Sequence, residues 1–347
     1  MKRSTLTGLI LLLLIGQIKA QGGQFSQFYS SAIFVNPAFA GTNPYLSARI
    51  NFNKSKLAGD GSLHDLSQAT VSYPVFQNTS RKFQVGGAGL TFFKETQGIQ
   101  GAFSTQKILL TGAYALKLKR LKNNTLIFGL QGGVTQTRIS LNGLQWGSQY
   151  NPYIGFDNTQ NPEDIGKLSS YHPVFNFGVL YSAIDNPNAM FRDRSFTIGL
   201  SADNLNTPKS RFGGLYLTDN PILFKLVSNA KFIVTPKTYV HPSLLVAYSS
   251  QSYQVNLGTY LSHQINSTMS DVALTLQVGT WYRLFDSFIV LGGFKINDFS
   301  AGISYDLNSN TYRNNEIYGQ IAPSFEVSLG YDFNFRNNPF KVNSPIF

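Results

Sequence analysis

The chain has 347 residues, no cysteine and a formal net charge of +11; 13% of its residues are charged and 14% are aromatic. The absence of cysteine excludes disulfides, thiolate metal sites and a lipoprotein anchor. Few charges, many aromatics and 31 glycines are typical of an outer-membrane β-barrel, with a large soluble β-sandwich or propeller as the alternative.

Residues 1–20 have the pattern of a secretory signal peptide that is cleaved. Lys2 and Arg3 precede an apolar run, and Ala20 supplies a small residue before the cut. The run is shorter than the ~20 residues that a membrane-spanning helix needs, which disfavours an uncleaved anchor. Cleavage would leave the mature chain with a charge of about +8. Since its basic residues are scattered, no nucleic-acid partner is expected.

Residues 21–44 are predicted to form an N-terminal periplasmic segment ahead of the first strand. Its central part, 24–42, reads QFSQFYSSAIFVNPAFAGT and lacks helical periodicity. Asn36-Pro37 favours an extended or turn conformation. A segment this apolar is expected to be buried rather than exposed to water. We predict that it folds into the barrel mouth as a partial periplasmic plug, with direct contact to a partner as the alternative.

Alternation of apolar and polar residues recurs in segments of about ten residues and predicts membrane strands. Near the C-terminus, Phe325, Val327 and Leu329 alternate with Glu326 and Ser328. The polar face carries serine, glycine, asparagine and isolated charges, which suits a barrel lumen better than a soluble surface. We predict an all-β, antiparallel transmembrane barrel of about 14 strands. The strands are expected at 45–52, 66–75, 83–93, 105–117, 125–137, 171–182, 194–203, 226–235, 239–249, 252–262, 271–283, 287–294, 298–307 and 323–335.

The barrel is expected to span residues 45–335, followed by a C-terminal periplasmic tail at 336–347. The pattern SxGxxFxF that begins at Ser328 resembles the signal by which barrel-assembly machinery recognises a last strand. An even number of strands places both termini at the same end of the barrel; if that end is periplasmic, the long connections lie at the outer end. The long connections are expected at 53–65, 94–104, 139–170, 204–225 and 308–322.

No arrangement of residues indicates catalysis, a cofactor or a metal, so the chain is not expected to be an enzyme. The four histidines lie far apart and lack the spacing of paired metal ligands. His64-Asp65 is the one local candidate for acid–base chemistry, and a solvated loop pair explains it better. Glycine pairs such as Gly86-Gly87 lie inside predicted strands, where barrel bends or close lumen contacts explain them better than a phosphate loop.

Two outer connections carry candidate residues for partner binding. In 139–170, aromatics are interleaved with asparagine and glycine, a composition that suits protein-binding or glycan-binding surfaces. A loop that packs on itself as a lid, or folds inward as a plug, is the equal alternative. The connection 204–225 is interpreted in the same way. The candidate residues are Trp146, Tyr150, Tyr153, Phe156, Arg211, Phe212 and Tyr216.

Both ends of the mature chain resemble the PorP/SprF-type outer-membrane proteins of the Bacteroidota type IX secretion system. At the N-terminal end, QFSQFY at 24–29 precedes an NPAFAG motif. AGISYDL at 301–307, PSFEVSL at 323–329 and PSLL at 242–245 extend the likeness over nearly the whole mature chain, and only the tail beyond Phe335 departs from it. The motif residues are Asn36, Pro37, Ala38, Phe39, Ala40 and Gly41.

The resemblance implies an outer-membrane barrel without cofactor that serves type IX secretion and, with it, gliding motility. SprF-like members assist the export or surface attachment of large secreted adhesins, whereas PorP-like members act with the periplasmic machinery; the SprF-like role is favoured. The expected partners are a secreted adhesin or other type IX secretion components, and outer-membrane lipid. The polar lumen equally allows a passive pore or small-molecule transporter, which stays the alternative.

Overall fold

The computed structural model describes residues 23–57, 62–76, 84–99, 101–118, 124–140, 147–157, 159–160, 168–184, 194–212, 215–250, 252–266, 273–308 and 321–333. The signal peptide and the C-terminal tail predicted above lie outside these residues. The long strands are β1 Leu46–Leu57, β2 Ser62–Phe76, β3 Gln84–Ile99, β4 Phe103–Lys117, β5 Asn124–Ile139, β8 Ser169–Ile184, β9 Ser195–Asp203, β12 Leu223–Thr235, β13 Thr238–Tyr248, β14 Tyr253–Asn266, β15 Ala273–Arg283, β16 Ser287–Ile296, β17 Phe299–Asn308 and β18 Ile321–Phe333.

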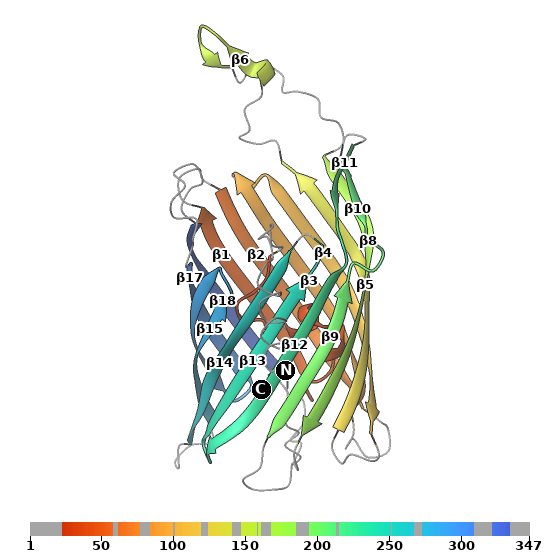
Figure 1. Cartoon of the computed structure of the whole chain (residues 1–347), viewed down its shortest axis with the longest axis vertical. Coiled ribbons are helices and arrows are strands. Elements are labelled where there is room, and N and C mark those ends of the chain that lie inside the picture. The colour runs from red at the N-terminus through yellow and green to blue at the C-terminus, as the bar shows by residue number, and fades with distance from the viewer. Residues whose placement is uncertain are drawn as a thin grey trace, which may run out of the picture.

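These fourteen strands form one closed antiparallel barrel, which confirms the predicted fold class (Figure 1). Each strand pairs with the next long strand in sequence, and β1 closes the ring by pairing with β18 from Leu46↔Phe333 onward. All fourteen predicted strands are present. The remaining elements are the hairpin strands β6 Tyr150–Asn151, β7 Gly155–Phe156, β10 Lys209–Phe212 and β11 Leu215–Asp219, with the short helices α2 Ala32–Val35, η1 Pro37–Phe39 and η2 Gly147–Gln149.

The barrel has two distinct ends. β1 begins and β18 ends at what we call the terminal end, which is the lower end in Figure 1. The opposite end, the loop end, carries the connections from β5 to β8 and from β9 to β12, which contain the hairpins β6–β7 and β10–β11. The odd-numbered strands of the ring all end there, as the strand count predicted.

Two predicted outer connections are largely strand. The β1–β2 ladder continues to Lys56↔Leu63 and the β3–β4 ladder to Gln97↔Phe103, so 53–65 and 94–104 were wrongly expected to be loops. Outward-facing positions there include Lys54 and Lys94. A charged residue interrupts the apolar alternation that marks a strand in lipid, although the backbone hydrogen bonds continue beyond it.

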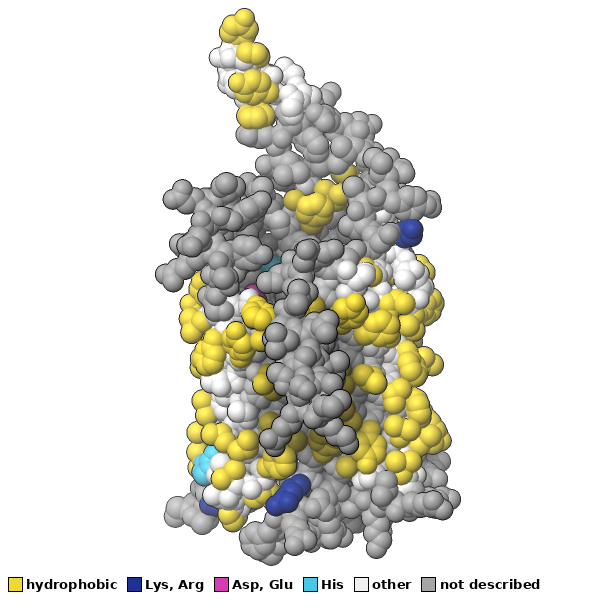
Figure 2. Space-filling model, in the orientation of Figure 1, with side chains coloured by type: hydrophobic (Ala, Val, Ile, Leu, Met, Phe, Trp, Pro, Cys, Tyr) yellow, Lys and Arg dark blue, Asp and Glu magenta, His cyan; other side chains and the backbone are white. Residues whose placement is uncertain are grey.

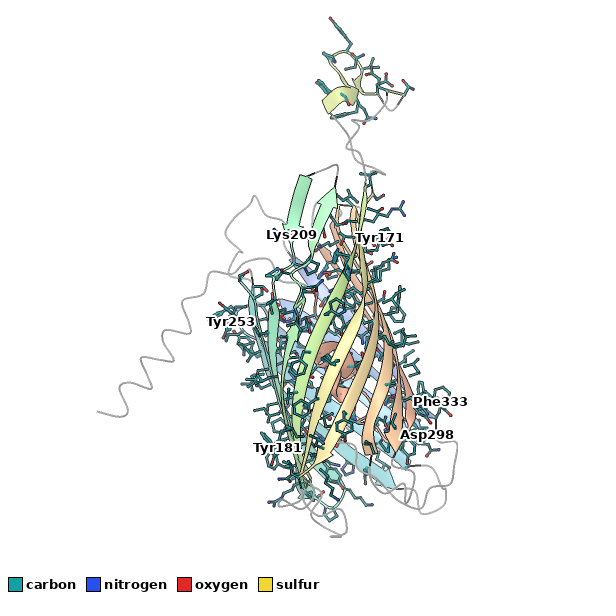
Figure 3. All side chains as sticks on the ribbon, turned by 90° about the vertical axis from the view of Figure 1, so that its right-hand side faces the viewer. Tyr171, Tyr181, Lys209, Tyr253, Asp298 and Phe333 are labelled. Carbon is teal, nitrogen blue, oxygen red and sulfur yellow. The ribbon has the colours of Figure 1, made fainter. Side chains whose placement is uncertain are left out.

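The outer surface of the barrel is apolar and its inner surface is polar. Along β9, buried serine, threonine and glycine alternate with exposed phenylalanine, isoleucine and leucine. Figure 2 shows hydrophobic side chains over the wall, and Figure 3 shows Tyr171 toward the loop end and Tyr181 toward the terminal end. This arrangement suits a wall that faces lipid. No helix among the described residues is long and apolar enough to cross a membrane.

Candidate functional site

Residues 23–42, here called the plug, lie inside the barrel (Figure 1). The plug is compact because Asn36 and Pro37 begin a turn of 3-10 helix: the Asn36 Oδ1 accepts a hydrogen bond from the Ala38 N–H at 2.9 Å, and Pro37 occupies the first helical position. Gly41 follows with a φ of +71°, a conformation that favours glycine. The expected turn at Asn36-Pro37 is confirmed.

The NPAFAG motif is bonded to the wall through Asn36, which is fully buried. Its Nδ2 donates to the backbone carbonyls of Val179 on β8, at 3.2 Å, and Leu200 on β9, at 3.1 Å. Ser201 donates from its Oγ to the Val35 carbonyl at 2.9 Å. Asn36 thus bonds the plug to two neighbouring strands, β8 and β9, and its buried amide group is satisfied by their backbone carbonyls.

Glycines in the wall make room for the motif. A Cβ on Gly129 would lie 2.3 Å from the Ala38 nitrogen, and one on Gly87 would lie 2.3 Å from the Gly41 Cα. A Cβ on Gly178 would lie 2.0 Å from the Asn36 Oδ1. Side chains at these positions would overlap the plug, so the predicted close lumen contact of the strand glycines is confirmed at Gly87.

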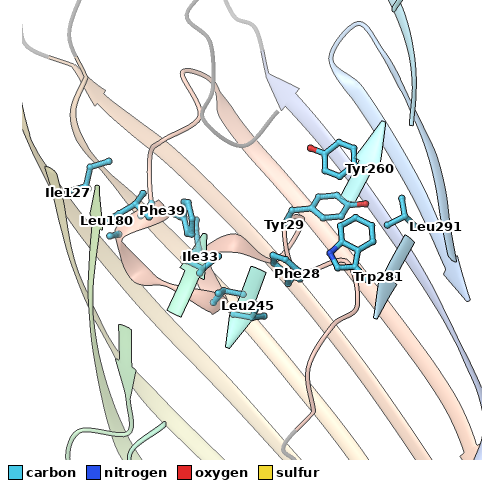
Figure 4. Close-up of a cluster of buried hydrophobic side chains, with 14 of the residues drawn as sticks. Phe28, Tyr29, Ile33, Phe39, Ile127, Leu180, Leu245, Tyr260, Trp281 and Leu291 are labelled. Carbon is cyan, nitrogen blue, oxygen red and sulfur yellow. The ribbon is translucent and has the colours of Figure 1, made fainter. Parts of the chain in front are cut away.

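An aromatic cluster holds the part of the plug that precedes the motif. Phe28 packs edge-on against Trp281, at 6.3 Å between ring centroids, and Tyr29 stacks on the same indole at 5.9 Å. Tyr260 lies 5.5 Å from Tyr29 and completes the group (Figure 4). All of these rings are buried. Aromatic pairs of this geometry stabilise beyond the area they bury.

The start of the plug is held by carboxylates near the loop end. Glu326 accepts hydrogen bonds from the backbone N–H groups of Ser26, at 2.7 Å, and Gln27, at 2.9 Å. Asp306 accepts from the Ser26 hydroxyl at 2.6 Å and from Arg283 at 3.2 Å. The plug therefore reaches further toward the loop end than a plug of the terminal mouth requires. Sequence patterns assigned Glu326 and Asp306 only to a polar lumen face; an isolated carboxylate at such a position was the available signal.

The plug has direct contacts with eleven of the fourteen strands of the barrel. Hydrogen bonds join it to β1, β2, β8, β9, β12, β15, β17 and β18. Ring contacts add β3 and β14, close backbone approach adds β5, and the same buried apolar cluster contains residues of β4, β13 and β16. The plug therefore lies against most of the ring.

The β6–β7 hairpin contains three of the residues predicted to bind a partner. Tyr150 and Phe156 pair across the hairpin with their rings 5.3 Å apart, while Tyr153 at the tip is 95% exposed and its neighbour Ile154 is 69% exposed. Asp157 ends the hairpin, where hydrogen bonds from the Thr159 hydroxyl and N–H lower the pKa of its carboxyl below the usual value. Trp146 lies outside the described residues.

The β10–β11 hairpin contains the other three candidates. In its ladder, Arg211 is paired with Tyr216 and Phe212 with Leu215. The two hairpins lie in different connections, so the candidates form two groups rather than one site.

No metal or catalytic centre is evident in the part of the chain that the structure describes. No group of three or more histidine, aspartate or glutamate side chains there could hold a metal ion. His64 lies on β2, not in a loop, and its Nε2 is 3.0 Å from the Glu95 carboxylate. The predicted solvated pair with Asp65 is wrong because the β1–β2 ladder extends through both residues.

Three solved structures are similar to this chain at low sequence identity. The toluene transporter TodX of Pseudomonas putida is 10% identical over 91% of this chain and 96% of that chain, with a TM-score of 0.48. A FadL homologue of Pseudomonas aeruginosa is 13% identical over 88% of this chain and 94% of that one, with a TM-score of 0.45. CdiB from Acinetobacter baumannii is 6% identical over 83% of this chain and 60% of its own, with a TM-score of 0.44.

The sequence matches a family model over most of its length. The model is that of the type IX secretion system membrane protein PorP/SprF, and it covers residues 18–331. No curated protein matches the chain. The match includes the plug with its NPAFAG motif and nearly all of the barrel. The chain therefore belongs to the PorP/SprF family of type IX secretion system membrane proteins.

Proposed function

We propose that this outer-membrane barrel serves type IX secretion as a closed partner protein and not as a conduit. Its role would be SprF-like, in the export or surface attachment of large secreted adhesins, or PorP-like, with the periplasmic machinery. One observation carries the proposal: the plug contacts eleven of the fourteen strands directly and shares a buried apolar cluster with residues of the other three, so passage through the lumen would require the loss of contacts around most of the ring.

The proposed orientation places the terminal end in the periplasm and the loop end outside. The start of β1 and the end of β18 would then lie on the periplasmic side, in keeping with the even strand number. The signal peptide at 1–20 would be removed, which frees the plug to dock in the lumen.

The surface that we propose for partner contact at the loop end is the β6–β7 hairpin. Tyr153 and Ile154 are large, exposed and adjacent, and the hairpin 147–156 contains no charged residue. Exposed aromatic and aliphatic residues of this kind are enriched at protein interfaces. In the adhesin role, this hairpin would meet the secreted protein after export.

A pull-down tests the role. The tagged barrel would be recovered from detergent-solubilised native membranes and its partners identified by mass spectrometry, with the Y153S/I154S variant as the matched control. We expect a large secreted protein or a type IX component with the unchanged barrel, and less of the surface partner with the variant. Secretion and surface adhesion that stay intact after deletion of the gene would overturn the proposal.

The alternative is a passive pore or small-molecule transporter. Conductance in planar bilayers separates the two, because an open passage gives steady ion current and a plugged barrel gives none. Steady current through the unchanged barrel would favour the pore.

A further inference from the structure

Charged side chains are nearly absent from the outer face of the barrel. Among the ring-strand residues whose side chains the structure describes, four charged ones face outward in the alternation of their strands. All four lie near the loop end on β1, β2, β3 and β5, and they are Lys54, Asp65, Lys94 and Arg138. The three basic residues, here called the outer cations, are exposed.

The strand register arranges the outer cations in two adjacent rows. The upper row lies in direct register across β1 to β5 and consists of Lys54, Asp65, Thr96, Ser104 and Arg138. The lower row is two residues nearer the terminal end and consists of Phe52, Ser67, Lys94, Gln106 and Gln136. Since strands are about 4.8 Å apart and rise about 3.4 Å per residue, Lys94 lies roughly 12 Å from both Lys54 and Arg138 along the wall.

On its terminal side, the lower row meets an apolar surface. The next outward residues are Phe92 on β3, Ile108 on β4 and Val134 on β5, and all three are exposed. Apolar residues in such a belt face lipid hydrocarbon, and lipid headgroups begin at its edge. Lysine and arginine can lay their stems along apolar surface and place their charges among the headgroups. The outer cations therefore lie at the height of the headgroups.

The wall on the other side of the closing pair β1–β18 has a different border at the loop end. The outward residues near that end of β16, β17 and β18 are Phe288, Leu307 and Phe325, and all three are exposed. Among the described side chains, the charged border is therefore confined to β1 through β5.

The ion pairs of the described residues do not include the outer cations. Asp65 is their one acidic neighbour on the described outer face, and its buried Oδ1 has no hydrogen-bond partner among the described residues. The connections that follow β1, β3 and β5 contain four acidic residues and one basic residue, namely Asp60, Asp157, Glu163, Asp164 and Lys167. What distinguishes the site is therefore the outward position of its cations at the edge of the apolar surface, and not the net charge of this end.

We propose that this outer face of β1–β5 binds the phosphates of an anionic lipid in the leaflet at the loop end. Lys94 and Arg138 would each meet a phosphate, since arginine donates two parallel N–H groups to such oxyanions and lysine supplies a point charge. The Ser104 hydroxyl and the Gln106 carboxamide belong to the same two rows on β4, between these cations, and are further donors.

An acidic segment of a protein could use the same cations. The exposed apolar residues directly beside them favour a ligand that also has acyl chains. The inference rests on the proposed function only for the orientation of the barrel, which decides the leaflet that supplies the lipid.

Binding of a defined phosphorylated lipid to the intact barrel tests the proposal. The full chain in a non-ionic detergent would be titrated with diphosphorylated lipid A, and the bound lipid would be counted by native mass spectrometry. The K94Q/R138Q variant removes two outer cations. The R194Q/K237Q variant is the matched control, since it removes one exposed arginine and one exposed lysine at the terminal end.

We expect K94Q/R138Q to bind lipid A about tenfold more weakly, and R194Q/K237Q to bind it as the unchanged barrel does. Thermal unfolding of each variant would verify that the barrel is intact. Equal binding by the unchanged barrel and K94Q/R138Q, or equal losses in R194Q/K237Q, would overturn the proposal.

The D65N variant gives a second reading that does not depend on the removal of a cation. It removes the one acidic neighbour on the described outer face and should bind lipid A about threefold more tightly. Unchanged or weaker binding by this variant would contradict the proposed site.

A fluorescein-labelled peptide of alternating glutamate and serine, read by anisotropy, separates lipid from protein. Peptide binding that depends on Lys94 and Arg138, without binding of lipid A, would assign the outer cations to an acidic partner and overturn the lipid. Loss of secretion on gene deletion together with equal lipid A binding by all variants would refute this inference while leaving the proposed function in place.

Discussion

The plug and the β6–β7 hairpin have similar compositions and opposite environments. Residues 24–42 and 147–156 each combine aromatics with an Asn-Pro pair, and neither contains a charged residue. Yet Phe25 and Phe28 are 1% and 2% exposed, whereas Tyr153 is 95% exposed. Composition alone therefore does not decide whether such a segment is buried.

The difference lies in whether the chain supplies a complementary surface. For the plug, the wall provides glycines that leave room, carbonyls that accept from Asn36 and a carboxylate that accepts two backbone N–H groups. For Tyr153, the described residues include no such surface. An exposed apolar segment without a complementary surface among the described residues is expected to have one on another molecule.

The largest effect is expected when a wall glycine that contacts the plug is replaced by a larger residue. Gly129→Val would place its Cβ about where the Ala38 backbone lies, at 2.3 Å from the nitrogen. We expect the plug to be displaced and ion current to appear in planar bilayers. Gly112→Val is the matched control, because no other atom lies within 4 Å of a Cβ there. Current in both variants, or in neither, would contradict the proposed seating.

Removal of the indole beneath the plug should have the next largest effect. Trp281→Ala deletes a buried ring that contacts Phe28 and Tyr29, and such deletions cost about 3–5 kcal/mol of unfolding free energy. Urea unfolding in lipid bilayers measures the loss. Tyr282→Ala, one residue along β15 and on the outer face, should cost clearly less. Equal losses would show that the plug does not depend on this ring.

The third largest effect is expected when Asn36 of the NPAFAG motif is replaced. Asn36→Ala removes one acceptor and two donor contacts and leaves buried carbonyls with less hydrogen bonding, for a loss of about 2–3 kcal/mol in unfolding free energy. Asn36→Asp should be worse, since a carboxylate would face the carbonyls of Val179 and Leu200. If the aspartate variant unfolds at the same urea concentration as the unchanged barrel, these bonds do not hold the plug.

The smallest effect on stability is expected at the hairpin. Tyr153→Ser removes an exposed ring and should change the unfolding free energy by less than about 0.5 kcal/mol. Its effect should appear instead as weaker recovery of a partner in the pull-down. A large loss of stability would indicate that the hairpin packs on its own barrel as a lid.

Much of the barrel was predictable because lipid imposes a strict alternation on its strands. The alternation weakens at the loop end, where Lys54 and Lys94 face outward, and the predicted strands end too early there. The hairpin strands β6 and β10 were missed because they have two and four residues, too few for a period to be evident.

The plug could be predicted to be buried, but its contacts could not. Its apolar content indicated burial, whereas its position depends on complementarity with residues far away in sequence. Nothing local to Gly178 shows that it must leave room for Asn36, and the Ser26–Glu326 contact joins residues separated by 300 positions.

That sequence separation has a consequence for the order of assembly. Ser26 and Gln27 lie near the N-terminal end of the described residues and are made early, whereas Glu326 lies on the last strand. Contacts between residues so far apart in the sequence form late and slowly. A barrel with the segment before its first strand inside the ring is most simply built by wrapping the strands around that segment. The N-terminal segment would then act as a template for barrel closure. Pairing of β1 with β18 would close the wall with the plug already inside.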